Sequence, residues 1–162
     1  MDNRRRMLMA AAAKIEPLVV YKPGDTITTV NAYGASWSIS WYKYTFGSSY
    51  LELQQKYNQS TDGVAIVGPL DFTKYNKLTI DFIGKSFSNS ATEQTTIGYM
   101  KGSSYASSNF VDNQAVTFAS LNGVTKHIEF DISGQSGSKW IYFKYIMKGS
   151  TNYTRITNIT LE

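Results

Sequence analysis

The feature that most constrains the fold is an alternation of apolar and polar residues with a period of two. In the segment 36–41, small hydroxyl side chains separate Trp37, Ile39 and Trp41. Successive side chains of a strand point to opposite faces, so this pattern predicts a strand with one apolar face. Such strands are typical of antiparallel sheets that bury one face and expose the other.

The same alternation recurs in 78–82 and in 128–132, where acidic residues occupy the polar positions. Further strands are predicted at 18–21, 50–57, 64–67, 95–100, 115–118, 140–147 and 156–161. Turn-forming residues separate them at 23–25, 62–63, 122–123 and 134–137. About ten short strands without helical crossovers predict an all-β, antiparallel β-sandwich or jelly roll. No internal repeat is evident, which argues against solenoids and propellers.

The first sixteen residues differ in composition from the rest. Residues 4–14 are good helix formers, and Pro17 ends any helix near Ile15. The apolar run 7–13 is short and rich in alanine for a secretion signal. The sequence therefore predicts an N-terminal anchor at 1–16, helical or extended, and a β-sandwich domain at 17–162.

Composition excludes several classes of function. The chain has no cysteine and one histidine, so thiolate and multi-histidine metal sites are not expected. Four basic residues and one acid among the first fourteen residues supply +3 of the net charge of +4. The remaining twelve basic and eleven acidic residues leave the body nearly neutral, so no nucleic-acid binding is expected. No segment has the ~20 apolar residues needed for membrane insertion.

Candidate catalytic residues do not form a recognisable motif. Glu52, Asp81, Glu129 and Asp131 occupy outward strand positions, where a solvated acid is the usual reason for a carboxylate. His127 shares the outward phase of Glu129 and Asp131, so a surface histidine is expected. Because nucleophile-elbow and phosphate-loop patterns are also missing, we expect a protein that is not an enzyme and has no cofactor. No clustered acidic motif for a metal ion is present, so a site would have to be built from carbonyl groups and scattered acids, and metal binding stays open.

Three stretches carry a resemblance to a known class of proteins. Gly68–Phe82 is similar to a turn and strand of carbohydrate-binding-like jelly rolls. Phe130–Gly134, Trp140–Phe143 and Ile156–Glu162 resemble the closing strands of such modules in bacteriophage virion proteins, and Arg4–Met9 is similar to the starts of small phage structural proteins. The resemblance implies a sandwich whose rim or sheet face contacts a glycan or another capsid or tail subunit. It also implies a homo-oligomer, for which we expect a trimer.

Aromatic residues are abundant, with twelve Tyr, eight Phe and three Trp. Tyr42 and Tyr44 fall on the phase opposite Trp37 and Trp41, and Trp140 and Tyr142 fall on the phase opposite Ile141 and Phe143. These residues, expected to be exposed, are candidates for glycan contacts: Tyr42, Tyr44, Trp140 and Tyr142. The alternatives are packing under a loop, a subunit interface or a preference for strand geometry.

The basic anchor is expected to dock on another protein. Its candidate contacts are Arg4, Arg5, Arg6, Met7, Leu8 and Met9, which fit an acidic, partly apolar site. A disordered, solvated tail is the alternative. The sequence thus favours a virion component of the decoration, head-fibre or tail-attachment type, displaying a sandwich that binds surface glycans. The alternative is a stand-alone carbohydrate-binding module of a gut bacterium.

Overall fold

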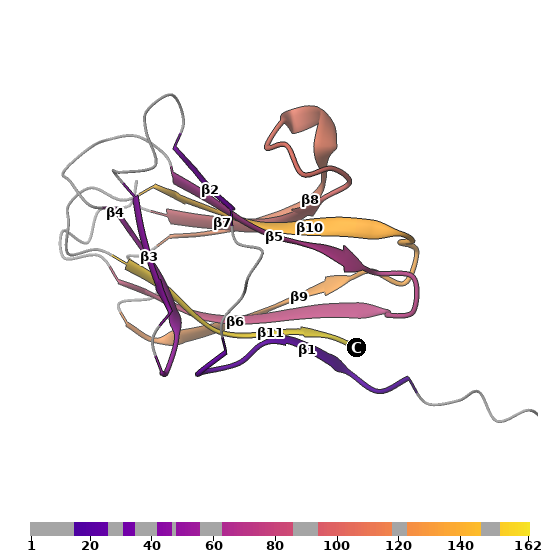
Figure 1. Ribbon diagram of the computed structural model, residues 1–162, viewed down its shortest axis with the longest axis horizontal. Coiled ribbons are helices and arrows are strands. Elements are labelled where there is room, and N and C mark those ends of the chain that lie inside the picture. Colours follow the sequence, from indigo (N-terminus) through magenta and orange to yellow (C-terminus); the bar gives the residue numbers. More distant parts are fainter. Residues whose placement is uncertain are drawn as a thin grey trace, which may run out of the picture.

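The computed structural model describes residues 15–25, 31–34, 42–46, 48–55, 63–85, 94–117, 123–146 and 153–162. These residues form two antiparallel sheets packed face to face (Figure 1). One sheet has six strands: β1 (Leu18–Tyr21), β3 (Tyr42–Phe46), β4 (Leu51–Gln55), β6 (Lys77–Lys85), β9 (Thr125–Asp131) and β11 (Tyr153–Leu161). The other has five: β2 (Asn31–Gly34), β5 (Gly63–Asp71), β7 (Gln94–Met100), β8 (Phe110–Thr117) and β10 (Ser138–Ile146). The predicted all-β sandwich is confirmed.

The strand order shows how the chain closes around one core. The six-stranded sheet runs β3-β4-β11-β6-β9, and β1 pairs with the end of β11. The five-stranded sheet runs β2-β5-β10-β7-β8. Strands β11 and β10 therefore occupy interior positions in their sheets, so each has paired neighbours on both sides.

In β6 and β9 the alternation correctly predicted which residues enter the core, whereas the predicted strand 36–41 lies outside the described residues. Leu78, Ile80 and Phe82 are fully buried between the sheets, whereas Glu129 and Asp131 point to solvent. The segments 31–34 and 42–46 were not predicted as strands, although Tyr42, Tyr44 and Phe46 alternate with the polar residues Lys43 and Thr45. A single turn of 3-10 helix at Ser107–Asn109 was also missed, since the serine-rich stretch around it reads as a loop. Of the anchor, only residues 15 and 16 are described, so its helical or extended form stays a prediction.

Two turns at one end of the sandwich share the same local structure. Asp71 ends β5, and its carboxylate accepts a hydrogen bond from the Thr73 N–H at 3.0 Å. Asp131 ends β9 and accepts from the Ser133 N–H at the same distance. In each turn the intervening residue, Phe72 or Ile132, is fully buried. These caps direct the chain from one sheet to the other while an apolar side chain closes the end of the core.

The sheets are also joined across the core by two hydroxyl groups. Thr95 in β7 and Thr154 in β11 are fully buried, and their Oγ1 atoms lie 2.6 Å apart. At the β8–β9 edge, the Gln114 side chain donates to the Glu129 carbonyl at 2.8 Å. That second bond occupies a carbonyl on an edge strand, which reduces the tendency of the edge to pair with another chain.

We expect the Thr95–Thr154 pair to show strong coupling in a double-mutant cycle. Thr95→Val leaves the Thr154 hydroxyl buried without its partner, which costs about 1–3 kcal/mol. The double variant with Thr154→Val removes both hydroxyls at nearly constant volume, so most of that loss should be recovered. Urea unfolding of the four proteins measures the coupling. Additive losses would show that the two hydroxyls do not depend on each other.

Candidate functional site

Strand β10 presents different residues to the two faces of the five-stranded sheet. Ile141, Phe143 and Tyr145 belong to the core between the sheets. Trp140 and Tyr142 belong to a second apolar cluster, on the outer face. The predicted phase of these two aromatic residues is therefore confirmed, although their exposure differs from the prediction.

Tyr142 is not an exposed ring, so that part of the prediction is wrong. Only 1% of this residue is accessible, because Tyr105 and Phe110 cover it. The Phe110 ring stacks on Tyr142 with centroids 5.0 Å apart, and the Tyr105 ring meets it edge-on at 5.3 Å. Burial raises the pKa of Tyr142 to about 12. Packing under a loop, one of the alternatives considered from the sequence, is what the structure shows.

The loop that supplies Tyr105 runs from Lys101 to Asn109 and rises above β8 and β10, on the side away from the six-stranded sheet (Figure 1). Its ends are joined by a hydrogen bond from the Lys101 N–H to the Asn109 carbonyl at 3.0 Å. The Asn109 side chain also donates to the Ser104 carbonyl at 2.8 Å. A compact, internally bonded loop can hold an aromatic residue over a sheet. Sequence reasoning missed both Tyr105 and Phe110, because the serine-rich surroundings carry no strand pattern.

Tyr142 can lie flat on the sheet because its cross-strand neighbour is Gly98. A Cβ at position 98 would lie 2.9 Å from Tyr142 Cε1 and 2.7 Å from Asn113 Cβ, closer than side chains tolerate. On the core side, Gly63 of β5 is the cross-strand neighbour of Tyr145, and a Cβ at position 63 would collide with the Tyr145 ring. Aromatic residues of β10 thus cover glycines of both neighbouring strands.

Trp140 is the candidate ring that remains half-exposed among the described residues. It lies at one end of the aromatic cluster, in register with Met100 of β7. Two positions beyond Tyr142, the register places Lys144 beside Thr96, and Thr96 beside Ala115 of β8. The outer face therefore passes from aromatic rings to a cationic and a hydroxyl side chain. Rings and polar groups side by side can stack against a sugar ring and pair with its hydroxyl groups.

The other predicted site residues do not join this cluster. Tyr42 and Tyr44 belong to β3 of the six-stranded sheet, in register with Gln55 and Leu53, and their side chains lie outside the described part of the chain. The anchor residues Arg4 to Met9 also lie outside it. Alternation assigns a residue to one face of a strand, but it does not say to which sheet the strand belongs.

The four acids considered for catalysis have structural partners instead. Glu52 accepts from Arg155 Nε at 2.6 Å, and Asp131 caps its turn. Asp81 and Glu129 flank His127: Asp81 Oδ1 lies 2.6 Å from His127 Nδ1, and Glu129 Oε1 lies 3.3 Å from Nε2. Hydrogen bonds from His127 and Lys77 lower the pKa of Glu129, and those from Ser133 lower the pKa of Asp131. A general acid needs a raised pKa, so the environments of Glu129 and Asp131 do not suit that role.

Within the described ranges, no group of three or more acids or histidines has the geometry to hold a metal ion. The same ranges contain no helix that is long and apolar enough to cross a membrane.

Comparison with known proteins finds similar structures but no similar sequence. No family model and no curated sequence matches the chain. A cleaved adhesin domain of Lys-gingipain from Porphyromonas gingivalis superposes with a TM-score of 0.62 at 14% identity, covering 91% of this chain and 98% of that one. A variant of a family 29 carbohydrate-binding module superposes with a TM-score of 0.56 at 10% identity, covering 91% of this chain and 92% of that one. A family 11 carbohydrate-binding module from Clostridium thermocellum, in complex with a β-1,3-1,4-mixed-linked tetrasaccharide, superposes with a TM-score of 0.54. The two sequences are 15% identical, and the match covers 90% of this chain and 94% of that one. These likenesses establish a carbohydrate-binding-module-like β-sandwich fold.

His127 should make stability depend on pH. Hydrogen bonds that the His127 ring donates to the carboxylates of Asp81 and Glu129 raise its pKa above the ordinary value of 6.5. The protonated ring therefore stabilises the fold fully below that value, and this stabilisation is lost as the pH rises through the folded-state pKa. We expect His127→Gln to lower the melting temperature more at about pH 5.5 than at about pH 8.5.

Thermal unfolding followed by circular dichroism at both pH values measures this difference. No second histidine titrates in that window. An equal decrease at both pH values would mean that the charged ring contributes nothing.

Proposed function

We propose that this chain is a non-catalytic carbohydrate-binding module whose ligand lies on the outer face of the five-stranded sheet. The observation that carries the proposal is the aromatic cluster at Trp140, Tyr105 and Phe110, beside the polar positions of Thr96 and Lys144. The structural neighbours support the proposal, because two of them are named as carbohydrate-binding modules.

The chemistry of this face suits a sugar. A pyranose has an apolar C–H face that stacks on an indole or phenol ring, and hydroxyl groups at its rim that need hydrogen-bond partners. Trp140 is backed by Gly68, where a Cβ would lie 2.8 Å from Trp140 Cδ1, so the ring rests directly on the strand backbone. A side chain held in this way loses little conformational entropy when a ligand binds.

The virion interpretation gains no support from the structural neighbours. The alternative drawn from the sequence, a carbohydrate-binding module, fits them better, and we therefore prefer it to a decoration or tail protein. Docking of the basic anchor on a capsid or tail protein, and a trimeric state, stay predictions. Light scattering of the full chain and of residues 17–162 would test whether the anchor drives assembly.

Replacing Trp140 should weaken glycan binding selectively. Trp140→Ala removes the stacking surface, and we expect affinity for the cognate polysaccharide to fall at least about tenfold. Affinity electrophoresis on a panel of soluble polysaccharides, including β-1,3-1,4-mixed-linked glucan, identifies the ligand and measures the loss. His127→Ala, on the six-stranded sheet, is the matched control and should bind like the wild type.

Circular dichroism must show that both variants are folded. Unchanged retention of a folded Trp140→Ala protein would refute this binding face, and the absence of retention by wild type on every polysaccharide would refute the function.

A further inference from the structure

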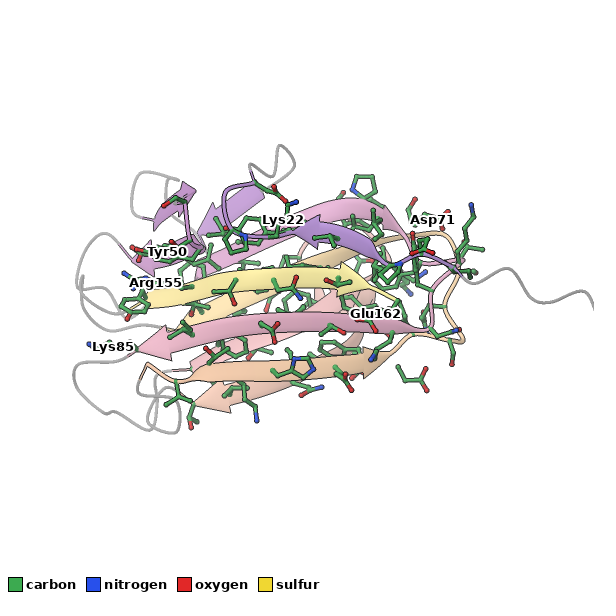
Figure 2. The ribbon with its side chains drawn as sticks, turned by 90° about the horizontal axis from the view of Figure 1, so that it is seen from below. Lys22, Tyr50, Asp71, Lys85, Arg155 and Glu162 are labelled. Carbon is green, nitrogen blue, oxygen red and sulfur yellow. The ribbon has the colours of Figure 1, made fainter. Side chains whose placement is uncertain are left out.

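The outer face of the six-stranded sheet contains an arginine held by three side chains. Arg155 of β11 places its guanidinium carbon 3.8 Å from the centroid of the Tyr153 ring and 4.1 Å from that of Tyr50. Its Nε donates to Glu52 of β4, the residue directly opposite in the strand register. Figure 2 shows Tyr50 and Arg155 together at one end of this face.

These contacts fix the orientation of the guanidinium. The bond to Glu52 uses Nε, one of five N–H donors, and the two Nη groups carry the other four. The two rings restrict rotation of the side chain, although 28% of it is still accessible to solvent. An arginine restrained in this way presents a planar pair of donors at little entropic cost.

A second basic residue lies at the same end of the face as Arg155. Lys85 of β6 lies in register with Tyr153 and at the same end of the sheet (Figure 2). Glu162 lies at the opposite end of the face, where it pairs with Lys77 at 3.1 Å.

We propose that Arg155 forms a second ligand site, which binds the carboxylate of an acidic sugar such as a uronic acid. The planar carboxylate would accept two hydrogen bonds from the Nη groups, the geometry in which arginine binds carboxylates most strongly. Tyr50 and Tyr153 border the site and offer ring surface to the sugar. That the carboxylate belongs to a sugar rests on the proposed function, whereas the anion site rests on Arg155 alone.

Two variants test the site, because one should lower its affinity for an acidic sugar and the other should raise it. Calorimetric titration of the full chain with tri-galacturonic acid should show saturable binding, and neutral galactotriose should show none at this site. Arg155→Lys keeps the charge but loses the planar donor pair, so affinity should fall about tenfold. Glu52→Gln keeps an oxygen that accepts from Nε but removes a negative charge that repels the ligand carboxylate, so affinity should rise about threefold or more.

The outcomes separate this site from the first one. Trp140→Ala should leave galacturonate binding unchanged even where it abolishes retention on a neutral polysaccharide. A purely structural arginine predicts that Glu52→Gln lowers the melting temperature and does not tighten binding, and that result would overturn the proposal. So would the absence of saturable heat with wild type, or equal affinity of Arg155→Lys. Replacement of galacturonate by inorganic sulfate at equal affinity would show a general anion site and would refute the sugar-acid assignment.

Discussion

The buried apolar layer between the two sheets is the interaction on which the rest of the structure depends. Phe82 and Ile156 from one sheet and Phe143 from the other belong to a single core and are fully buried. Burying a side chain of this size contributes about 1.5–3 kcal/mol, so this layer supplies most of the favourable free energy of folding. The hydrogen bond between Thr95 and Thr154 adds a directional contact, which fixes how the sheets lie on each other.

The position of β10 links this core to the candidate site. Its core-facing residues fix the strand in the middle of its sheet, and the same backbone then presents Trp140 and Tyr142 outward. Gly98 of β7 leaves room for the Tyr142 ring. The rigidity of the aromatic face therefore follows from core packing, and a ligand that stacks there meets a surface that needs little rearrangement.

The two outer faces differ in what they can recognise. The five-stranded sheet carries an apolar cluster partly covered by the loop 101–109, whereas the six-stranded sheet carries ion pairs such as Lys77–Glu129 and Arg155–Glu52. Exposed ion pairs such as Lys77–Glu129 add little stability. Arg155 differs because two tyrosine rings restrain it, which is why we assign it a ligand.

The sequence by itself determined the fold class and the core faces of strands such as β6 and β9, because alternation is a local property of the chain. It also determined that Trp140 and Tyr142 lie opposite Ile141. Only the tertiary structure decided that the loop 101–109 covers Tyr142, and that Tyr42 and Tyr44 belong to the other sheet. The meeting of Arg155 with Glu52, and of His127 with Asp81, likewise depends on strand order. These contacts join residues far apart in the chain, and periodicity carries no information about which strands become neighbours.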